Sequence, residues 1–219
     1  MAHAQYEDAT AIRPVESADL AGRIGPNAIT QLEAVLLERL GRVETARLFD
    51  NAGVAYYLEQ PPTAMVDERD VARLHHQVRL ALPVPEARRI LFEAGDRTGR
   101  YILANRIPRP AVFVLRHLPA LLSARLLTRA IARHAWTFAG SGAFEIRRHA
   151  GRRLITAEID RNPVVALDTR EPSESRICHW HAAVFQRLFR ELVHAATTVD
   201  ETDCCAAGAP ACRFEIQFG

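Results

Sequence analysis

Residues 174–219 read ESRICHWHAAVFQRLFRELVHAATTVDETDCCAAGAPACRFEIQFG and contain all four cysteines of the chain. The first half repeats apolar side chains at helical spacing, from Ile177 to Leu192. The end alternates instead, and its apolar side chains, from Cys212 to Phe218, share one face of a strand. This stretch therefore predicts a helix followed by a hairpin, with cysteines at the start of the first and in the turn of the second.

Three of these cysteines and one carboxylate can converge where the helix begins and the hairpin turns. Thiolates are soft donors that suit a tetrahedral zinc ion. The alternative is that they are reduced core cysteines, which pack as small hydrophobes. The spacing is not the paired C-x-x-C of many zinc sites, so spacing alone leaves both interpretations open.

The pattern E-x-x-C-x7-C from Glu201 to Cys212, followed by an alternating strand, resembles the zinc site of the 4-vinyl reductase domain family. FEAGDRTGRYILANRIPRP (92–110) and ARHAWTFAGSGAFEI (132–146) resemble the branch of that family in bacteriochlorophyll biosynthesis, which is named bacteriochlorophyll 4-vinyl reductase. The likeness covers nearly the whole chain after about Gly25.

The resemblance implies a structural zinc ion with four protein ligands and no open position, leaving Cys205 over. His179 and His181 flank the first cysteine and could rival it, but the family pattern favours the cysteine. The implied ligands are Cys178, Glu201, Cys204 and Cys212.

Composition excludes several classes of protein. A length of 219 residues is enough for one domain with a proper core. The formal charge is only +2, which gives no strong attraction to nucleic acid or to an anionic membrane. The basic residues are all arginine. Clustered cysteines without a secretory signal favour the cytoplasm, and no apolar run reaches the length of a membrane span.

The order of the predicted elements indicates an α+β fold with helices packed on one small antiparallel sheet. We expect a flexible arm over 1–25 and a single domain over 26–219, with the metal site in 178–212. The resemblance implies the same fold, shared with vesicle-tethering and nitric-oxide-sensing ligand domains. The predicted helices cover 29–40, 43–51, 67–82, 86–105 and 111–135, the last kinked at Pro119, and period-two strands follow from Trp136 onward, around 144–146 and 155–159.

Two glycines, Gly95 and Gly99, lie one turn apart within a predicted helix. Glycine costs helix stability, so a pair on one face suggests the close approach of another backbone or of a flat ligand. The alternative is a helix that breaks at Gly95.

Arg125, Arg129 and Arg133 recur every four residues along the most apolar predicted helix. Such a row is usually a solvated face, but it would also suit the carboxylates of a tetrapyrrole. His134 and Trp136 follow the row and complete the predicted ligand-binding residues. Other candidates for an axial magnesium ligand are His117 and the pair His75-His76, and further aromatic side chains that could enclose a flat ligand are Tyr101, Phe138 and Phe144.

Redox chemistry lacks a recognisable cofactor motif. Gly140-Ser141-Gly142 leads into a strand and has no third glycine, so it fails the dinucleotide-binding context. We therefore expect a carrier that holds a magnesium porphyrin or chlorophyllide and delivers it to an enzyme of bacteriochlorophyll biosynthesis. The alternatives are an 8-vinyl (older numbering 4-vinyl) reductase with an unidentified donor and, less favoured, a ligand sensor. A homodimer and, at most, peripheral membrane contact are compatible with the sequence; nucleic acid is not an expected partner.

Overall fold

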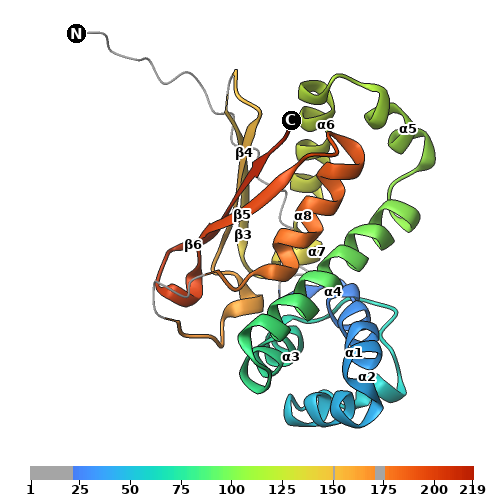
Figure 1. Ribbon diagram of the computed structural model, residues 1–219, viewed down its shortest axis with the longest axis vertical. Coiled ribbons are helices and arrows are strands. Elements are labelled where there is room, and N and C mark those ends of the chain that lie inside the picture. Colours follow the sequence, from blue (N-terminus) through green and yellow to red (C-terminus); the bar gives the residue numbers. More distant parts are fainter. Residues whose placement is uncertain (1–21, 150, 171–175) are drawn as a thin grey trace.

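The computed structural model describes residues 22–149, 151–170 and 176–219. A four-stranded antiparallel sheet forms one layer and helices lie against one of its faces, so the predicted α+β class is confirmed (Figure 1). The helices are α1 (Asn27–Asn51), α2 (Tyr56–Glu59), α3 (Glu68–Ala81), α4 (Val84–Asn105), α5 (Arg109–His117), α6 (Ala120–Arg133), α7 (Trp136–Ala139) and α8 (His179–Leu192). The strands are β1 (Arg23–Ile24), β2 (Val66–Asp67), β3 (Ala143–Arg148), β4 (Leu154–Asp160), β5 (Thr198–Asp203) and β6 (Ala211–Gln217).

The N-terminal boundary lies earlier than predicted. Most of the expected arm, residues 1–21, lies outside the described residues. Its end is part of the fold, because Arg23–Ile24 pairs with Val66–Asp67 in a small second sheet that the sequence did not predict. The side chain of Ile24 is fully buried. The folded part of the chain therefore begins before residue 26.

The first helices follow their sequence signals. Gly41 interrupts α1 with a φ of 79°, so the two predicted helices meet there at a kink. The carboxylate of Asp67 accepts a hydrogen bond from the backbone N–H of Arg69 at 2.8 Å and caps α3 as predicted. At the other end of α3, Arg79 forms a buried ion pair with Asp168 in the segment after β4.

Helices α4 and α8 pack very closely, which explains the two glycines. The helix α4 continues through both positions. A Cβ at Gly95 would lie 2.2 Å from the carbonyl oxygen of Trp180, and one at Gly99 would lie 2.7 Å from Cβ of Arg187. The close approach of another backbone is thus the correct interpretation, and the predicted break at Gly95 is wrong.

The apolar stretch after the IPRP segment forms two helices rather than one kinked helix. Leu118 is extended, with a ψ of 152°, because the residue before a proline avoids helical geometry. The chain after α6 also differs from prediction, because Trp136–Ala139 forms the short helix α7 and period-two structure begins only at Ala143.

The sheet brings the two hairpins together in the order β3-β4-β6-β5. Cys212 of β6 pairs with Ile159 of β4, and Glu201 of β5 pairs with Phe214 of β6. Apolar side chains of both hairpins pack against Phe185 of α8 in one buried core. This register places the hairpin cysteines beside the start of α8.

Candidate metal centre and predicted ligand-binding residues

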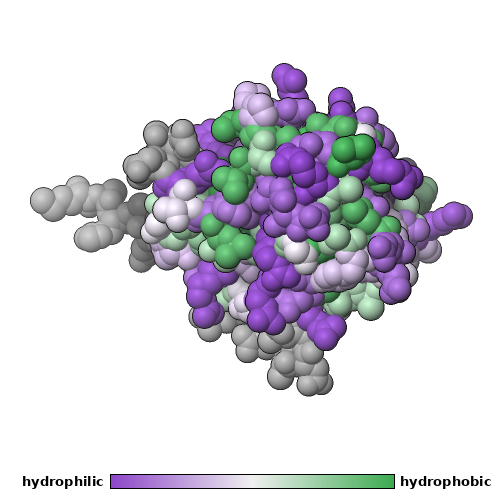
Figure 2. Space-filling model, turned by 90° about the horizontal axis from the view of Figure 1, so that it is seen from below, coloured by the Kyte–Doolittle hydropathy of each residue, from purple (hydrophilic) through white to green (hydrophobic). Residues whose placement is uncertain are grey.

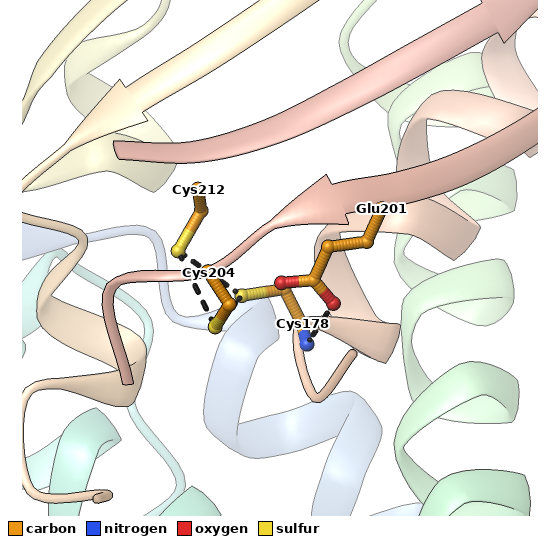
Figure 3. A group of neighbouring side chains, drawn as sticks. All are labelled: Cys178, Glu201, Cys204 and Cys212. Carbon is orange, nitrogen blue, oxygen red and sulfur yellow. Dashed lines mark hydrogen bonds between the residues drawn. The ribbon is translucent and has the colours of Figure 1, made fainter. Parts of the chain in front are cut away.

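The helix start and the second hairpin bring together four buried side chains, Cys178, Glu201, Cys204 and Cys212 (Figure 3). Cys178 is the N-cap of α8, and the other three lie on or beside β5 and β6. Their potential ligand atoms all lie within 4.8 Å of one another, and each side chain is at most 5% exposed. These four residues can hold a metal ion in a site closed to solvent.

The three sulfur atoms form a nearly regular triangle. The Sγ–Sγ distances are 3.4 Å for Cys178–Cys212 and 3.8 Å for both Cys178–Cys204 and Cys212–Cys204. The sulfurs are free thiols rather than disulfides. The triangle therefore leaves room for an ion in contact with all three sulfur atoms.

Glu201 is held in place by one of its two carboxylate oxygens. Its Oε2 accepts a hydrogen bond from the backbone N–H of Cys178 at 2.8 Å, whereas its buried Oε1 has no partner. An unpaired buried carboxylate oxygen is costly, and coordination of a cation would satisfy it. Glu201 thus supplies the fourth donor to the group of three sulfurs.

Two hydrogen-bond donors outside the predicted set support the sulfur atoms. Asn162 Nδ2 donates to Cys178 Sγ at 3.5 Å, and the backbone N–H of Cys205 donates to Cys212 Sγ at 3.3 Å. Such outer contacts orient metal ligands and stabilise thiolates. The sequence carries no signal for Asn162, because its position depends on how the loop after β4 folds back.

The electrostatics of the group favour a cation. Burial raises the pKa of Glu201 to about 8 and raises the pKa of the Cys178 thiol well above its usual range. Hydrogen bonds from the thiols of Cys178 and Cys212 lower the pKa of Cys204 to about 2. Four buried acids so close together cannot all ionise without a positive charge among them, because like charges repel. A divalent ion would stabilise all four ionised forms.

The two neighbouring histidines do not belong to this group. His181 is buried, and its Nε2 lies 3.3 Å from the carbonyl oxygen of Phe138. His179 is half-buried and also lies outside the set of four. The structure thus gives the position beside the hairpin to Cys178. Cys205, the cysteine left over, lies with its Sγ 3.8 Å from the carbonyl oxygen of Pro210.

The predicted ligand-binding residues lie on and just after α6. Arg125, Arg129, Arg133 and His134 are exposed, and Trp136 in α7 is half-buried. The structure therefore brings the three arginines together as one row on an exposed helix face. Whether that face binds a ligand stays a prediction.

The other candidate histidines have protein partners. His75 is fully buried, and its Nε2 donates to the carbonyl oxygen of Ala28 at 3.0 Å. His76 Nδ1 lies 3.1 Å from Asp168, and His117 Nδ1 lies 2.7 Å from the carbonyl oxygen of Phe113.

Arg148 joins the basic row, although the sequence did not single it out. Burial, with the nearby charges of Arg125 and Arg129, lowers the pKa of Arg148. Strand alternation places Arg148 on the same face of β3 as Ile146, beside α6. Residue spacing alone could not reveal it, since it comes from another element.

The glycine-containing segment before β3 forms a turn held by Glu68. Its carboxylate accepts hydrogen bonds from the backbone N–H and the hydroxyl of Ser141, at 2.7 and 2.6 Å. A carboxylate at this place would repel a phosphate. A cavity of about 600 Å³ lies nearby and is lined by Gly22, Arg23, Tyr57, Met65, Val66, Asp67, Glu68 and Arg69. The predicted ligand-binding residues are not among them.

Two relatives decide the family of this chain. It is 51% identical to the bacteriochlorophyll synthase 23 kDa chain of Cereibacter sphaeroides over 197 residues, which cover 90% of this chain and 91% of the relative. The chain belongs to the family of bacteriochlorophyll synthase 23 kDa chains. The protein of that name from Rhodobacter capsulatus is 43% identical over 194 residues, which cover 89% of this chain and 86% of the relative.

The family resemblance inferred from the sequence is confirmed at the level of the domain. Residues 155–218 match the 4-vinyl reductase (V-4-R) domain family, and all four residues of the metal centre lie in this range. The relatives are named as chains of a bacteriochlorophyll synthase, so the predicted name of a bacteriochlorophyll 4-vinyl reductase is not confirmed. Participation in bacteriochlorophyll biosynthesis is supported.

Solved structures with the same fold are H-NOX domains. One was studied for heme distortion, and it shares 12% sequence identity with a TM-score of 0.54, covering 89% of this chain and 95% of its own. A mutant of the T. tengcongensis H-NOX gives 12% identity and a TM-score of 0.52, with 89% and 96% covered. The predicted kinship with nitric-oxide-sensing ligand domains is therefore confirmed for the fold.

Proposed function

We propose that this chain binds a magnesium tetrapyrrole of bacteriochlorophyll biosynthesis and delivers it to an enzyme of the pathway. The observation that carries the proposal is the basic row on α6, flanked by exposed apolar side chains, in a chain of the bacteriochlorophyll synthase 23 kDa family. A flat apolar ring with carboxylate groups is complementary to such a surface.

The charge around this row is unbalanced. Between Asp96 and Glu145 the sequence has eight arginines and no aspartate or glutamate. Arg116 reaches Glu191 on α8 to form an ion pair. Arg125, Arg129 and Arg133 form no ion pair with another described residue, and Arg148 adds a fourth charge beside them. An anionic ligand would relieve their mutual repulsion.

Apolar and aromatic groups lie within reach of the basic row. Leu122 and Leu126 are exposed on the adjacent row of α6, and Trp136 follows in α7. These side chains supply apolar contacts for a ring, while the arginines supply bidentate donors for its carboxylates. His134, exposed at the end of α6, is the nearest imidazole that could ligate magnesium.

The fold favours the same class of ligand. The H-NOX domain with the TM-score of 0.54 was studied as a heme protein, and heme is also a tetrapyrrole. At 12% identity this likeness supports only the capacity of the scaffold to accept such a ligand. The choice of a bacteriochlorophyll precursor comes from the family of the chain.

Zinc is the ion that we propose for the metal centre. Zinc–sulfur bonds of about 2.3 Å in a tetrahedron place sulfur atoms about 3.8 Å apart. Two of the three sulfur distances equal that value and the third is 3.4 Å. With Glu201 as fourth ligand the ion would have no open position, so its role would be to fix the start of α8 to the second hairpin.

The ligand's carboxylates provide the test of the basic row. We expect Arg125→Gln with Arg129→Gln to weaken binding of a magnesium porphyrin dicarboxylate and to leave binding of its diester nearly unchanged. Each charge-assisted hydrogen bond lost costs about 1.5–3 kcal/mol, or about tenfold or more in affinity. The affinities can be measured by absorption titration.

The matched control is Arg42→Gln with Arg89→Gln, two exposed arginines on α1 and α4. This variant should bind the acid as the parent protein does. Equal affinity of the parent protein for acid and diester would remove the basic row from the ligand site.

A further inference from the structure

Helix α5 exposes apolar side chains instead of burying them. Leu115 is its one buried residue, while Phe113 is 64% exposed and Val114 is also exposed. The helix lies at the outer edge of the molecule, away from the sheet (Figure 1). An amphipathic helix normally turns such side chains toward a core, so this apolar surface lacks a partner within the described chain.

Helix α6 continues the same surface with two parallel rows. One row is Leu121, Arg125, Arg129 and Arg133, and the other is Leu122, Leu126, Ala130 and His134. All eight residues are exposed. Basic and apolar side chains thus alternate on one face of a helix whose opposite face is buried.

Exposed apolar side chains concentrate here. Of the eleven large hydrophobic residues exposed in the described chain, five lie on α5 and α6. Seen from below, at the end formed by α1, α2 and α3, the molecule instead shows small hydrophobic patches separated by hydrophilic residues (Figure 2). We call the concentrated region the α5–α6 surface; it consists of Phe113, Val114, Leu121, Leu122 and Leu126 with Arg109, Arg125, Arg129 and Arg133.

The charge of this surface is of one sign. Residues 109–133 contain five arginines and no acidic residue, although the whole chain carries only +2. Arg109 and the three arginines of α6 form no ion pair with another described residue. The low net charge of the chain therefore conceals a concentrated positive surface.

We propose that the α5–α6 surface docks on a lipid bilayer that contains anionic phospholipid. Leucine and phenylalanine side chains enter the boundary between headgroups and acyl chains, and long arginine side chains extend to the phosphates. No helix in the described ranges is long and apolar enough to span a membrane, so the contact is with one leaflet.

A second copy of the chain fits this surface less well. In a twofold dimer the same patch meets itself, so the arginines would face arginines with no carboxylate between them. A leaflet supplies both missing complements at once, phosphates for the arginines and an apolar layer for the leucines. The proposal is independent of pigment binding.

Flotation of pigment-free, zinc-containing protein with lipid vesicles tests the proposal. We expect binding to vesicles of equal parts phosphatidylglycerol and phosphatidylcholine, weaker binding at high salt, and little binding to phosphatidylcholine alone. Because Arg125 and Arg129 are also assigned to the pigment, the variants use other residues of the surface.

Two variants separate charge from apolar contact. Arg109→Gln should lower the vesicle partition coefficient about fivefold, the effect of one basic residue near an anionic surface. Phe113→Ser with Leu121→Ser should lower it about tenfold or more. The matched controls Arg42→Gln and Leu80→Ser, at exposed positions of α1 and α3, should bind as the parent does.

Retained zinc and an unchanged melting temperature would show that the variants are folded. The proposal is overturned if the parent protein does not float with anionic vesicles, or if surface and control variants bind equally. It is also overturned if Leu121→Ser abolishes self-association, measured by sedimentation, while vesicle binding is unchanged, because a second copy would then occupy the surface.

Discussion

Among single residues, those of the metal centre show how far a sequence pattern can reach. Cys178, Glu201, Cys204 and Cys212 were predicted from residue type, a helix start, a turn and a family resemblance, and the structure brings all four together. Spacing alone left reduced core cysteines open, because the first ligand precedes the others by more than twenty residues. Only the pairing of β5 with β6 beside α8 brings the set together.

Zinc content is the first prediction for these residues. Natively purified protein should contain about one zinc per chain, and Cys212→Ser should lose the metal and melt at a lower temperature, because binding of such an ion is coupled to folding. Metal analysis and thermal melting measure both quantities.

Cys205→Ser is the control, because this residue supports Cys212 through its backbone N–H rather than its side chain. This variant should keep its zinc. Native protein without zinc, or a Cys212→Ser variant with full zinc content, would contradict the assignment.

A second prediction for a single residue concerns His75. Burial is the main cause that lowers its pKa from 6.5 to about 3, so it stays neutral in the folded protein. Below pH 6.5 the unfolded chain binds a proton that the folded chain does not, so the free energy of unfolding decreases as pH falls toward 3. The slope is about 1.4 kcal/mol per pH unit.

Urea unfolding at several pH values from about 6.5 to about 5 measures this slope. His75→Gln keeps an N–H donor for Ala28 and removes the titration, so its stability should fall less steeply by about that amount. His117→Gln, at an exposed histidine, should retain the slope of the parent. Identical slopes for the parent and His75→Gln would exclude this role for His75.

Among the secondary-structure elements, local signals predicted most helices and both hairpins of the main sheet. Gly41 and Asp67 act through their own backbone and side chain, so the sequence suffices to identify them. The segment at Trp136 was predicted wrongly, because aromatic residues suit strands and short helices alike. The pairing of β1 with β2 escaped prediction, since it joins segments more than forty residues apart with only two residues each.

Gly95 provides the test of element packing. Gly95→Ala should destabilise the protein although alanine favours helices by about 1 kcal/mol over glycine, because the new Cβ would clash with the carbonyl of Trp180 and push α8 away. Arg89→Ala, on the exposed face of the same helix, should change stability little. Urea unfolding compares the two; an equally stable Gly95→Ala variant would contradict the close packing of α4 on α8.

For the molecule as a whole, the distribution of charge matters more than its sum. A net charge of +2 gave no reason to expect attraction to a membrane. The fold concentrates arginines of α6 beside Arg148 of β3 and leaves them without acidic partners there. Composition cannot reveal this, because it does not record which segments become neighbours.

The arrangement of the whole chain also relates the metal centre to the proposed ligand site. The metal centre lies at the N-terminal end of α8, while Ser123 of α6 donates a hydrogen bond to the carbonyl oxygen of Leu192 at the other end. A zinc ion that fixes α8 would thus help to fix the α6 row. The metal would act on ligand binding through the fold and not through contact with the ligand.

Under the proposed function, the chain binds a magnesium tetrapyrrole and does not reduce its vinyl group. Hydride transfer requires a cofactor positioned against the substrate by recognisable protein elements, and the one glycine-containing candidate is a turn held by Glu68. An anaerobic absorption titration of purified protein with divinyl chlorophyllide, continued after addition of NADPH or reduced ferredoxin, examines both statements in one sample. We predict a saturable shift of the Soret band at about one ligand per chain and no ethyl product; absence of binding, or catalytic formation of the ethyl product by this chain alone, would overturn the proposed function.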